Sequence, residues 1–342
     1  MINVIKEKWD EILELMKIEH DISDAAFKTW VKALYVHSVR GSKVYVTIKD
    51  ELATGIDYVI KKYKIPLQVA MCEVLDCQLD VDIEKKMHKA ISVIQFKLEG
   101  QVILRRPDFK MEKRLMLDKI NYENGTICID GKDYPLKDSY FPTIDPNHPY
   151  DLSADEKDLM DRLIKAFLNC EKLQRHAKFL FSAGGLYLCY NSNLYFHGCV
   201  PFNEDGSFRS VTLHGASYKG KALYDFLEAY ARKGYYMTNC PEEKAYGQDI
   251  MWYIWSSENS PVYGKAKMAT FERYLLSDAS LQEERKDFYY KLIEKEEICD
   301  KIIEEFGLDP KTAHVINGHM PVKAKAGENP VKGGGKLMII DG

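Results

Sequence analysis

The segment His-Val-Ile-Asn-Gly-His-Met-Pro-Val-Lys at 314–323 constrains the fold more than any other part of the chain. Its apolar residues Val315 and Ile316 predict a short strand, and an Asn-Gly pair beginning at Asn317 leads from that strand to His319. Asparagine and glycine allow the backbone to approach a ligand closely. A histidine that a loop holds at a strand end is a common way to present a metal ligand, although a loop histidine without a role is the alternative.

Composition limits the classes of function. The chain has 342 residues, a formal net charge of −4 and 29% charged residues, which gives no electrostatic footprint for nucleic acid or for a membrane surface. No apolar run reaches the length of a membrane span, and the N-terminus lacks the pattern of a signal peptide. The eight cysteines show no Cys-x-x-Cys spacing. We therefore expect a cytoplasmic protein with reduced thiols that binds neither membranes nor nucleic acid directly.

Helical and strand periodicities alternate along the chain, which predicts an α/β (α+β) fold in two pieces, residues 1–84 and 85–342. In the first piece the spacing predicts helices near 5–16, 23–30 and 50–63, with Pro66 as the stop of the last one, and strands at 33–39, 43–49 and 78–83. In the second piece it predicts helices at 86–99, 154–169, 221–232 and 286–306, a hairpin at 122–134, and strands at 178–181, 186–190 and 194–196.

Several runs in the second piece carry a family pattern. They include Lys89-Ala-Ile-Ser-Val-Ile-Gln-Phe-Lys-Leu-Glu-Gly100, Phe141-Pro-Thr-Ile-Asp-Pro146, Tyr190-Asn-Ser-Asn-Leu-Tyr-Phe-His-Gly-Cys-Val-Pro201 and Thr270-Phe-Glu-Arg-Tyr274. From about Met87 onward the chain resembles class III fructose-1,6-bisphosphatase, the firmicute-type enzyme on the calcineurin-like metallophosphoesterase plan. The resemblance implies a partial calcineurin-like domain. For the parent enzyme it implies Mn²⁺-dependent hydrolysis of the 1-phosphate of fructose 1,6-bisphosphate in gluconeogenesis.

The resemblance also assigns residues to a dinuclear site, in which two divalent ions lie roughly 3.5–4 Å apart. It maps His197 and His319, each placed after an apolar strand and before a proline, onto two histidine ligands of the family. Asn317 is then expected to orient the site through hydrogen bonds around the ligands. Arg175 and Arg273 are candidates for binding the substrate phosphate, because arginine pairs with phosphate through two parallel hydrogen bonds. Surface salt bridges are the alternative for both arginines.

The resemblance implies further metal ligands in Asp-x-His, Gly-Asp-x-x-Asp-Arg and Gly-Asn-His-Asp motifs, and none of these occurs in the sequence. Two histidines cannot hold two divalent ions tightly without the anionic ligands that offset the metal charge. We therefore expect a truncated domain with little or no turnover on its own. No residue is identified as a catalytic acid, base or nucleophile.

Two other groups of side chains are interpreted as structural. His214, in Val211-Thr-Leu-His-Gly215, imitates a second His-Gly signal but is expected to follow a loop. Trp252, Tyr253 and Trp255 predict an aromatic cluster in a core, with stacking on a sugar as the alternative.

Residues 1–84 carry a second resemblance. Trp9 and the blocks Phe27–Leu34 and Ile56–Tyr63 are similar to domain I of the replication initiator DnaA, a KH-like interaction module. This resemblance implies a unit that binds a replication protein or a second copy of itself.

Three hypotheses follow. In the first, the chain is a class III fructose-1,6-bisphosphatase relative that is truncated and weakly active or inactive alone. In the second, it is an interaction protein that acts through the DnaA domain I-like module in replication initiation. In the third, a second chain that carries the missing motifs assembles with this one.

Overall fold

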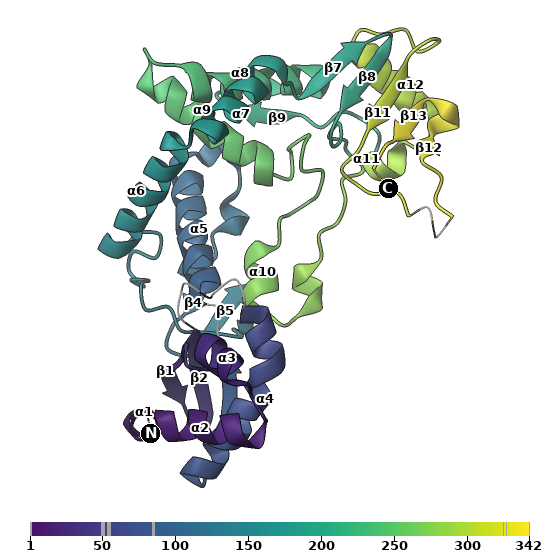
Figure 1. Cartoon of the computed structure of the whole chain (residues 1–342). Helices are drawn as coiled ribbons and strands as arrows, with labels where there is room; N and C mark the ends of the chain where they lie inside the picture. Colours follow the sequence, from purple (N-terminus) through teal and green to yellow (C-terminus); the bar gives the residue numbers. More distant parts are fainter. Residues whose placement is uncertain are drawn as a thin grey trace. The chain divides into compact units, whose positions relative to one another are not determined.

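The computed structural model describes residues 2–48, 52, 56–83, 86–323, 325 and 327–341 (Figure 1). Helices and strands are mixed throughout, which confirms the predicted α/β class. The chain divides into two compact units, residues 1–95 and 96–342, and each unit is described by itself. The division lies within helix α5 (Lys86–Arg105). The predicted border between Glu84 and Lys85 falls on residues outside the described part, so that border stays a prediction.

The N-terminal unit combines helices with one three-stranded sheet. Its main elements are α1 (Ile2–Glu7), α2 (Trp9–Glu19), α3 (Asp24–Ala26), β1 (Leu34–Arg40), β2 (Lys43–Ile48), α4 (Ile56–Leu75) and β3 (Asp80–Ile83). Strand β2 is central, antiparallel to β1 and parallel to β3. Side chains from α2, the sheet and α4, among them Ile12, Val46 and Leu67, form one buried apolar core. The KH-like identity of this unit stays a prediction.

The sequence prediction that Pro66 stops a helix was wrong. Helix α4 runs through Pro66 to Leu75, while the predicted start of that helix at Asp50 lies outside the described residues. An interior proline costs about 3 kcal/mol because it removes a backbone hydrogen bond. Tyr63, three residues before Pro66, and Leu67, directly after it, are fully buried in the core. Burying several such side chains offsets the cost of one lost hydrogen bond.

The described residues of the second unit form three sheets and most of the helices. Its strands are β4 (Ile120–Asn121), β5 (Thr126–Ile129), β6 (Lys132–Pro135), β7 (Tyr187–Tyr190), β8 (Asn193–Phe196), β9 (Val211–Leu213), β10 (Ala216–Tyr218), β11 (His314–Asn317), β12 (Val331–Lys332) and β13 (Leu337–Ile339). Its helices beyond α5 are α6 (Ala154–Asn169), α7 (Glu171–Ala183), α8 (Gly220–Tyr236), α9 (Pro241–Ser256), α10 (Thr270–Leu275), α11 (Tyr289–Leu292) and α12 (Glu296–Glu305).

The largest sheet has five strands in the order β12-β13-β11-β8-β7. Strand β11 is parallel to both of its neighbours, β8 and β13. Leu194, Val315 and Leu337 of these three strands are fully buried, and Ile302 and Ile303 of α12 pack against them in one cluster. Burial of the central strands therefore fixes where their C-terminal ends lie.

Helices α8 and α9 approach each other at two glycines. A Cβ atom on Gly234 would lie 2.5 Å from the carbonyl carbon of Gly247, and a Cβ on Gly247 would lie 2.3 Å from the carbonyl oxygen of Tyr230. Such distances are too short for any side chain, so this contact requires glycine in both helices.

Two further predictions of secondary structure were wrong. The segment 178–181, predicted as a strand, forms the C-terminal half of α7, because a short apolar run does not distinguish a strand from a helix. The predicted helix at 286–306 is broken into α11 and α12. Asp287 lies before α11, accepts a hydrogen bond from the backbone N–H of Tyr289 and forms an ion pair with Arg209 at 2.8 Å.

Candidate functional site

The C-terminal ends of three parallel strands bring several polar residues to one edge of the large sheet. His197 follows β8, Asn317 ends β11 and leads to His319, and Asp341 follows β13. Parallel strands in register end on the same side, and Val315 of β11 pairs with residues of both β8 and β13. The strands lie side by side in Figure 1. The sheet topology thus assembles this site from segments far apart in the sequence.

The two histidines predicted as metal ligands contact each other. Nε2 of His197 lies 3.0 Å from Nδ1 of His319, a hydrogen bond in which the tautomer decides the donor. The rings meet nearly edge to face, with an interplanar angle of 73°. His197 is exposed and His319 is half-buried, so the pair is open to solvent on the side of His197.

The backbone around His319 is held in an unusual conformation. His319 has φ +68°, in the left-handed region that few non-glycine residues adopt. The N–H of Gly318 donates to the carbonyl of His197 at 3.0 Å, which fastens the loop after β11 to the loop after β8. A Cβ atom on Gly318 would lie 3.0 Å from the carboxylate of Asp341. Glycine therefore allows Asp341 to approach the histidine loop.

Asn317, which the family resemblance predicts to orient the site, ends β11 two residues before His319. Its side chain is buried, and its Nδ2 donates to the carbonyl of Gly198 at 3.0 Å. Its Oδ1 and the Nε2 of His319 are buried without a hydrogen-bond partner among the described residues. Buried polar atoms normally have partners, so these two atoms at the strand ends are available to a ligand.

The pKa of His319 is lowered from its ordinary value of 6.5. Burial is the largest cause, because it disfavours the charged imidazolium. Electrostatic repulsion from His197 and Lys265 lowers the pKa further, whereas the backbone of Tyr263 and the carboxylate of Asp341 act in the opposite direction. At neutral pH His319 is therefore in the neutral form that a metal ion requires.

The described residues offer part of a metal site. Nε2 of His197 and Nδ1 of His319 share a hydrogen bond at 3.0 Å, which has to break before either nitrogen binds an ion, whereas Nε2 of His319 has no partner among the described residues. Among the described residues, however, no group of three or more His, Cys, Asp and Glu side chains is arranged to hold a metal ion. These residues fit a metal as part of a ligand set.

The two arginines predicted to bind a phosphate lie elsewhere. Arg175 is exposed on α7. Arg273, on α10, forms an ion pair with Glu284 at 3.3 Å, and Glu284 also binds Lys265 at 2.9 Å. Within the described part of the chain, no hydrogen bond or ion pair joins either arginine to the histidine pair. Lys265, which lowers the pKa of His319, connects Arg273 to the site through Glu284.

Sequence reasoning missed Asp341 and Lys265. The signal for Asp341 was present, because Asp341 follows the apolar residues Ile339 and Ile340 as His319 follows its own strand. Lys265 lies in an irregular segment between α9 and α10, where periodicity gives no information. His214 directly follows strand β9, so the prediction that it follows a loop was wrong; it lies in the turn between β9 and β10 with its ring against Tyr246.

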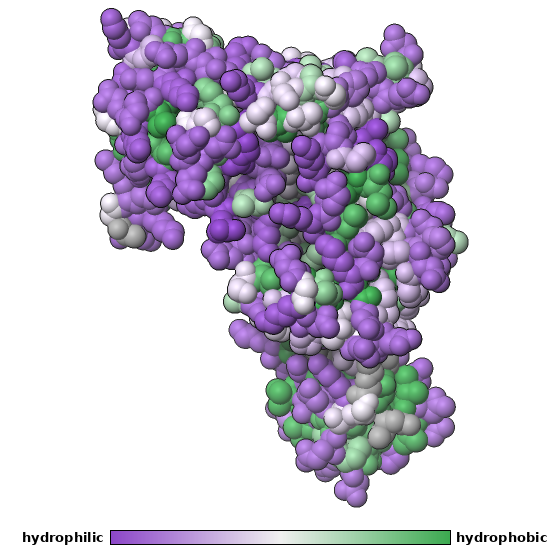
Figure 2. Space-filling view, turned by 180° about the vertical axis from the view of Figure 1, so that it is seen from behind, coloured by the Kyte–Doolittle hydropathy of each residue, from purple (hydrophilic) through white to green (hydrophobic). Residues whose placement is uncertain are grey.

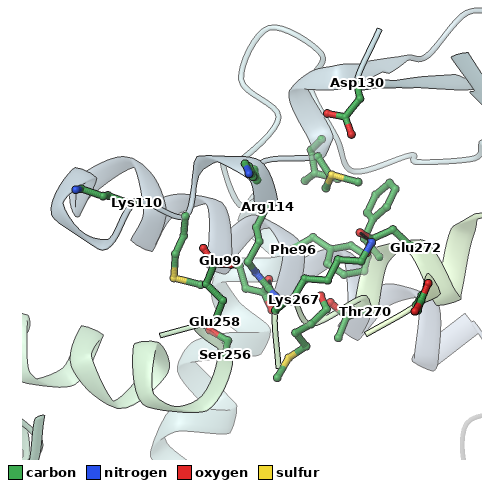
Figure 3. A pocket seen from close by; sticks show the side chains of 18 of the residues that line it. Phe96, Glu99, Lys110, Arg114, Asp130, Ser256, Glu258, Lys267, Thr270 and Glu272 are labelled. Carbon is green, nitrogen blue, oxygen red and sulfur yellow. Dashed lines mark hydrogen bonds and ion pairs between the residues drawn. The ribbon is translucent and has the colours of Figure 1, made fainter. Parts of the chain in front are cut away.

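A cavity of about 510 Å³ lies elsewhere in the second unit, lined by residues from α5, the turns at 107–119 and α10. Figure 3 shows Glu99 and Arg114 together in its centre, with Lys110 and Asp130 at opposite margins. Arg114 donates to Glu99 at 2.5 Å. Five cationic and five acidic residues line the cavity, so its walls carry no net charge that would attract a bisphosphate. Neither histidine of the pair lines it.

None of the helices in the described part combines the length and the apolar character that a membrane crossing requires.

The sequence profile of the family described as Firmicute fructose-1,6-bisphosphatase matches residues 66–342, and thus begins before the predicted onset near Met87. The DnaA domain I resemblance of residues 1–84 stays a prediction.

Several curated relatives are similar to most of the chain. The fructose-1,6-bisphosphatase class 3 of Alkaliphilus metalliredigens (strain QYMF) is 55% identical over 272 residues, which cover 79% of this chain and 41% of that protein. The proteins of the same name from Clostridium botulinum strains Langeland and Loch Maree are 55% and 56% identical over 265 and 263 residues. Those matches cover 78% and 77% of this chain and 40% and 39% of the relatives.

This chain spans about two fifths of the length of these relatives. The family profile covers the whole of the second unit, including the strand ends that carry His197, Asn317 and His319. The chain therefore belongs to the Firmicute fructose-1,6-bisphosphatase family.

Proposed function

We propose that this chain contributes the two-histidine part of the active site of a class III fructose-1,6-bisphosphatase. The reaction is hydrolysis of fructose 1,6-bisphosphate to fructose 6-phosphate and phosphate, in cytoplasmic gluconeogenesis. One observation carries the proposal: His197 and His319 meet at 3.0 Å at the ends of adjacent parallel strands. Membership of the family and the names of the relatives support the substrate.

The chain's own residues have distinct tasks in this proposal. His197 and His319 would hold a divalent metal ion through their ring nitrogens, and Asn317 would keep the loops after β8 and β11 together through Gly198. A bound ion at such a site polarises the phosphoryl group and supplies a hydroxide nucleophile. Lys265 places a positive charge near His319, where it would attract the substrate phosphate.

Mn²⁺ is the proposed metal, provided that oxygen ligands complete the site. Imidazole nitrogens alone suit Zn²⁺ better, whereas Mn²⁺ prefers carboxylate, carbonyl and water oxygens. The proposal therefore requires oxygen ligands from a second polypeptide that carries the motifs absent from this sequence. Arg175 and Arg273 remain proposed phosphate ligands, and Arg273 would have to leave Glu284 to reach a substrate.

The test is phosphate release from fructose 1,6-bisphosphate with added Mn²⁺. The chain is assayed alone and together with a polypeptide that comprises the part of the Alkaliphilus metalliredigens relative outside the match. We expect little turnover by the chain alone, and metal-dependent turnover by the mixture. His319→Ala should abolish that turnover, and His214→Ala, a histidine outside the site, should not.

Two outcomes contradict this proposal. Turnover by the mixture that survives His319→Ala removes the histidine pair from the active site. Turnover by the chain alone near a typical enzyme rate of about 10 s⁻¹ contradicts the need for further ligands.

A second candidate function is protein binding through the N-terminal unit. Ile18, Tyr58, Ile65 and Val69 of this unit are large apolar side chains exposed at its surface, and green apolar patches interrupt the hydrophilic surface in Figure 2. The DnaA domain I resemblance suggests a replication protein or a second copy as the partner. Ile18→Asp in the full chain should abolish capture of a replicative helicase or self-association. Capture that this substitution leaves unchanged contradicts the second candidate.

A further inference from the structure

The segment that follows α9 passes directly beside the loop that carries His197. The backbone N–H of Cys199, two residues after His197, donates to the carbonyl of Pro261 at 2.8 Å. A Cβ atom on Gly198 would lie 2.3 Å from the same carbonyl oxygen, so this approach requires glycine. Residues 261–265 are thereby brought against the histidine site.

Lys265 ends this stretch, and its backbone is fixed. Lys265 pairs with Lys286 in an isolated antiparallel bridge, and the N–H of Ala266 donates to the carbonyl of Arg285 at 2.8 Å. The charge of Lys265 reaches the histidine pair, because its repulsion lowers the pKa of His319. A fixed backbone does not fix the ammonium group, however, because lysine carries its charge on a flexible four-carbon stem.

Glu284 fixes the position of that ammonium group. Its Oε2 accepts a hydrogen bond from Nζ of Lys265 at 2.9 Å. Its Oε1 accepts from the backbone N–H of Ala269 at 2.9 Å and lies 3.3 Å from Nη1 of Arg273. The Glu284 side chain is 7% exposed. With both oxygens engaged in a buried position, the carboxylate holds Lys265 at one defined place.

Lys265 retains donors for a ligand. An ammonium group has three N–H donors, and the hydrogen bond to Glu284 uses one of them. The Lys265 side chain is 27% exposed, so the remaining donors are open to an anion from solvent. A phosphate accepts such charge-assisted hydrogen bonds.

We propose that Glu284 is a positioning residue that holds the ammonium group of Lys265 where it binds a phosphate of the substrate. A cation that is already in place loses less side-chain freedom when it binds an anion, so the complex is tighter. The inference rests on the proposed function, because it places the phosphate ester at the histidine pair. The alternative is a purely structural role, in which Glu284 only ties Lys265 to Ala269 and Arg273.

The test measures binding of fructose 1,6-bisphosphate to the metal-free full chain by NMR, with the ring signals of His197 and His319 as reporters. Lys265→Met should weaken binding by about tenfold or more, because a charge-assisted hydrogen bond is lost. Glu284→Asp keeps the negative charge but shortens the side chain by one methylene group, so that the carboxylate no longer reaches Lys265. It should weaken binding by about threefold or more.

The combination of the two substitutions separates positioning from a general loss of structure. If Glu284 acts through Lys265, Glu284→Asp should have no further effect on binding in a chain that already carries Lys265→Met.

Glu99→Asp is the matched control. Glu99 is also 7% exposed and pairs with Arg114 at 2.5 Å in the cavity of Figure 3. Glu99→Asp and Glu284→Asp should both lower the midpoint of thermal unfolding, because each withdraws a buried carboxylate from its cation. Only Glu284→Asp should change the binding of the bisphosphate.

Three results overturn the inference. The unaltered chain does not bind the bisphosphate; Glu284→Asp binds it as tightly as the unaltered chain; or Glu284→Asp weakens binding equally with and without Lys265→Met. Failure of the proposed function gives a different result, namely no turnover by the mixture of polypeptides while binding still depends on Glu284 and Lys265. Turnover by that mixture together with unchanged binding by Glu284→Asp removes this inference alone.

Discussion

Nε2 of His197 and Nδ1 of His319 lie 3.0 Å apart, although 122 positions separate the two residues in the sequence. The parallel pairing of β8 with β11 produces this contact, because it ends both strands at one edge of the sheet. The loops are then joined by two hydrogen bonds, from Gly318 to His197 and from Asn317 to Gly198. The rigid strands, rather than the loops, thus define the position of the pair.

The lowered pKa of His319 predicts its titration. In an NMR titration of the metal-free chain, His319 should titrate below 6.5. His197→Ala should move that titration upward, because it removes one of the two side chains whose electrostatic repulsion lowers the pKa of His319. The pKa of His319 is lower in the folded chain than its ordinary value of 6.5 in the unfolded chain, so between these two values the unfolded chain binds more protons. The contribution of His319 to the free energy of unfolding therefore falls as the pH falls below 6.5. A His319 titration at or above 6.5 would contradict the burial argument.

Metal binding by the chain alone should follow the ligand chemistry of the pair. Isothermal titration should detect Zn²⁺ more tightly bound than Mn²⁺, since both described ligands are imidazoles. His197→Ala and His319→Ala should each abolish the Zn²⁺ signal, and His214→Ala should retain it. Binding that persists in both single variants would show that the pair is not the metal site.

The buried ion pair of Lys97 and Glu156 should be essential for the stability of the second unit. The Lys97 side chain is fully buried, and its ammonium group also donates to the carbonyl of Thr143 at 2.6 Å. Lys97→Met leaves the Glu156 carboxylate buried without its counter-charge, which costs about 3–5 kcal/mol in the free energy of unfolding. Urea unfolding measures this loss. Adding Glu156→Gln should restore part of it, and an equally unstable double variant would argue against a charge effect.

The close approach of α8 and α9 should not tolerate a side chain. Gly247→Ala places a Cβ 2.3 Å from the carbonyl oxygen of Tyr230, so one helix must move and the free energy of unfolding should fall by about 1–3 kcal/mol or more. Gln248→Ala, an exposed neighbour on α9, is the control and should change stability by less than about 0.5 kcal/mol. Equal effects of the two substitutions would refute the steric explanation.

Local patterns in the sequence were sufficient for elements with strong signals. The predicted helix at 154–169 has the bounds of α6, because the Ser153–Glu156 capping box and a regular apolar stripe define it without help from the rest of the chain. The strands that precede His197 and His319 were also predicted, since each is a short apolar run between polar residues. The predictions at Pro66 and at residues 178–181 were wrong, because there tertiary packing rather than the local pattern decides the secondary structure.

The sequence alone determined the mixed α/β class and the family, and it predicted His197 and His319 as metal ligands and Asn317 as a residue that orients them, since these depend on residue type and local spacing. Only the tertiary structure decided that the two imidazoles are in contact, that the carboxylate of Asp341 lies beside Gly318, and that the apolar side chains of α6 and α7 are exposed. The physical reason is that strand pairing and burial depend on residues distant in sequence. Local periodicity shows which face of an element is apolar, but not what covers that face.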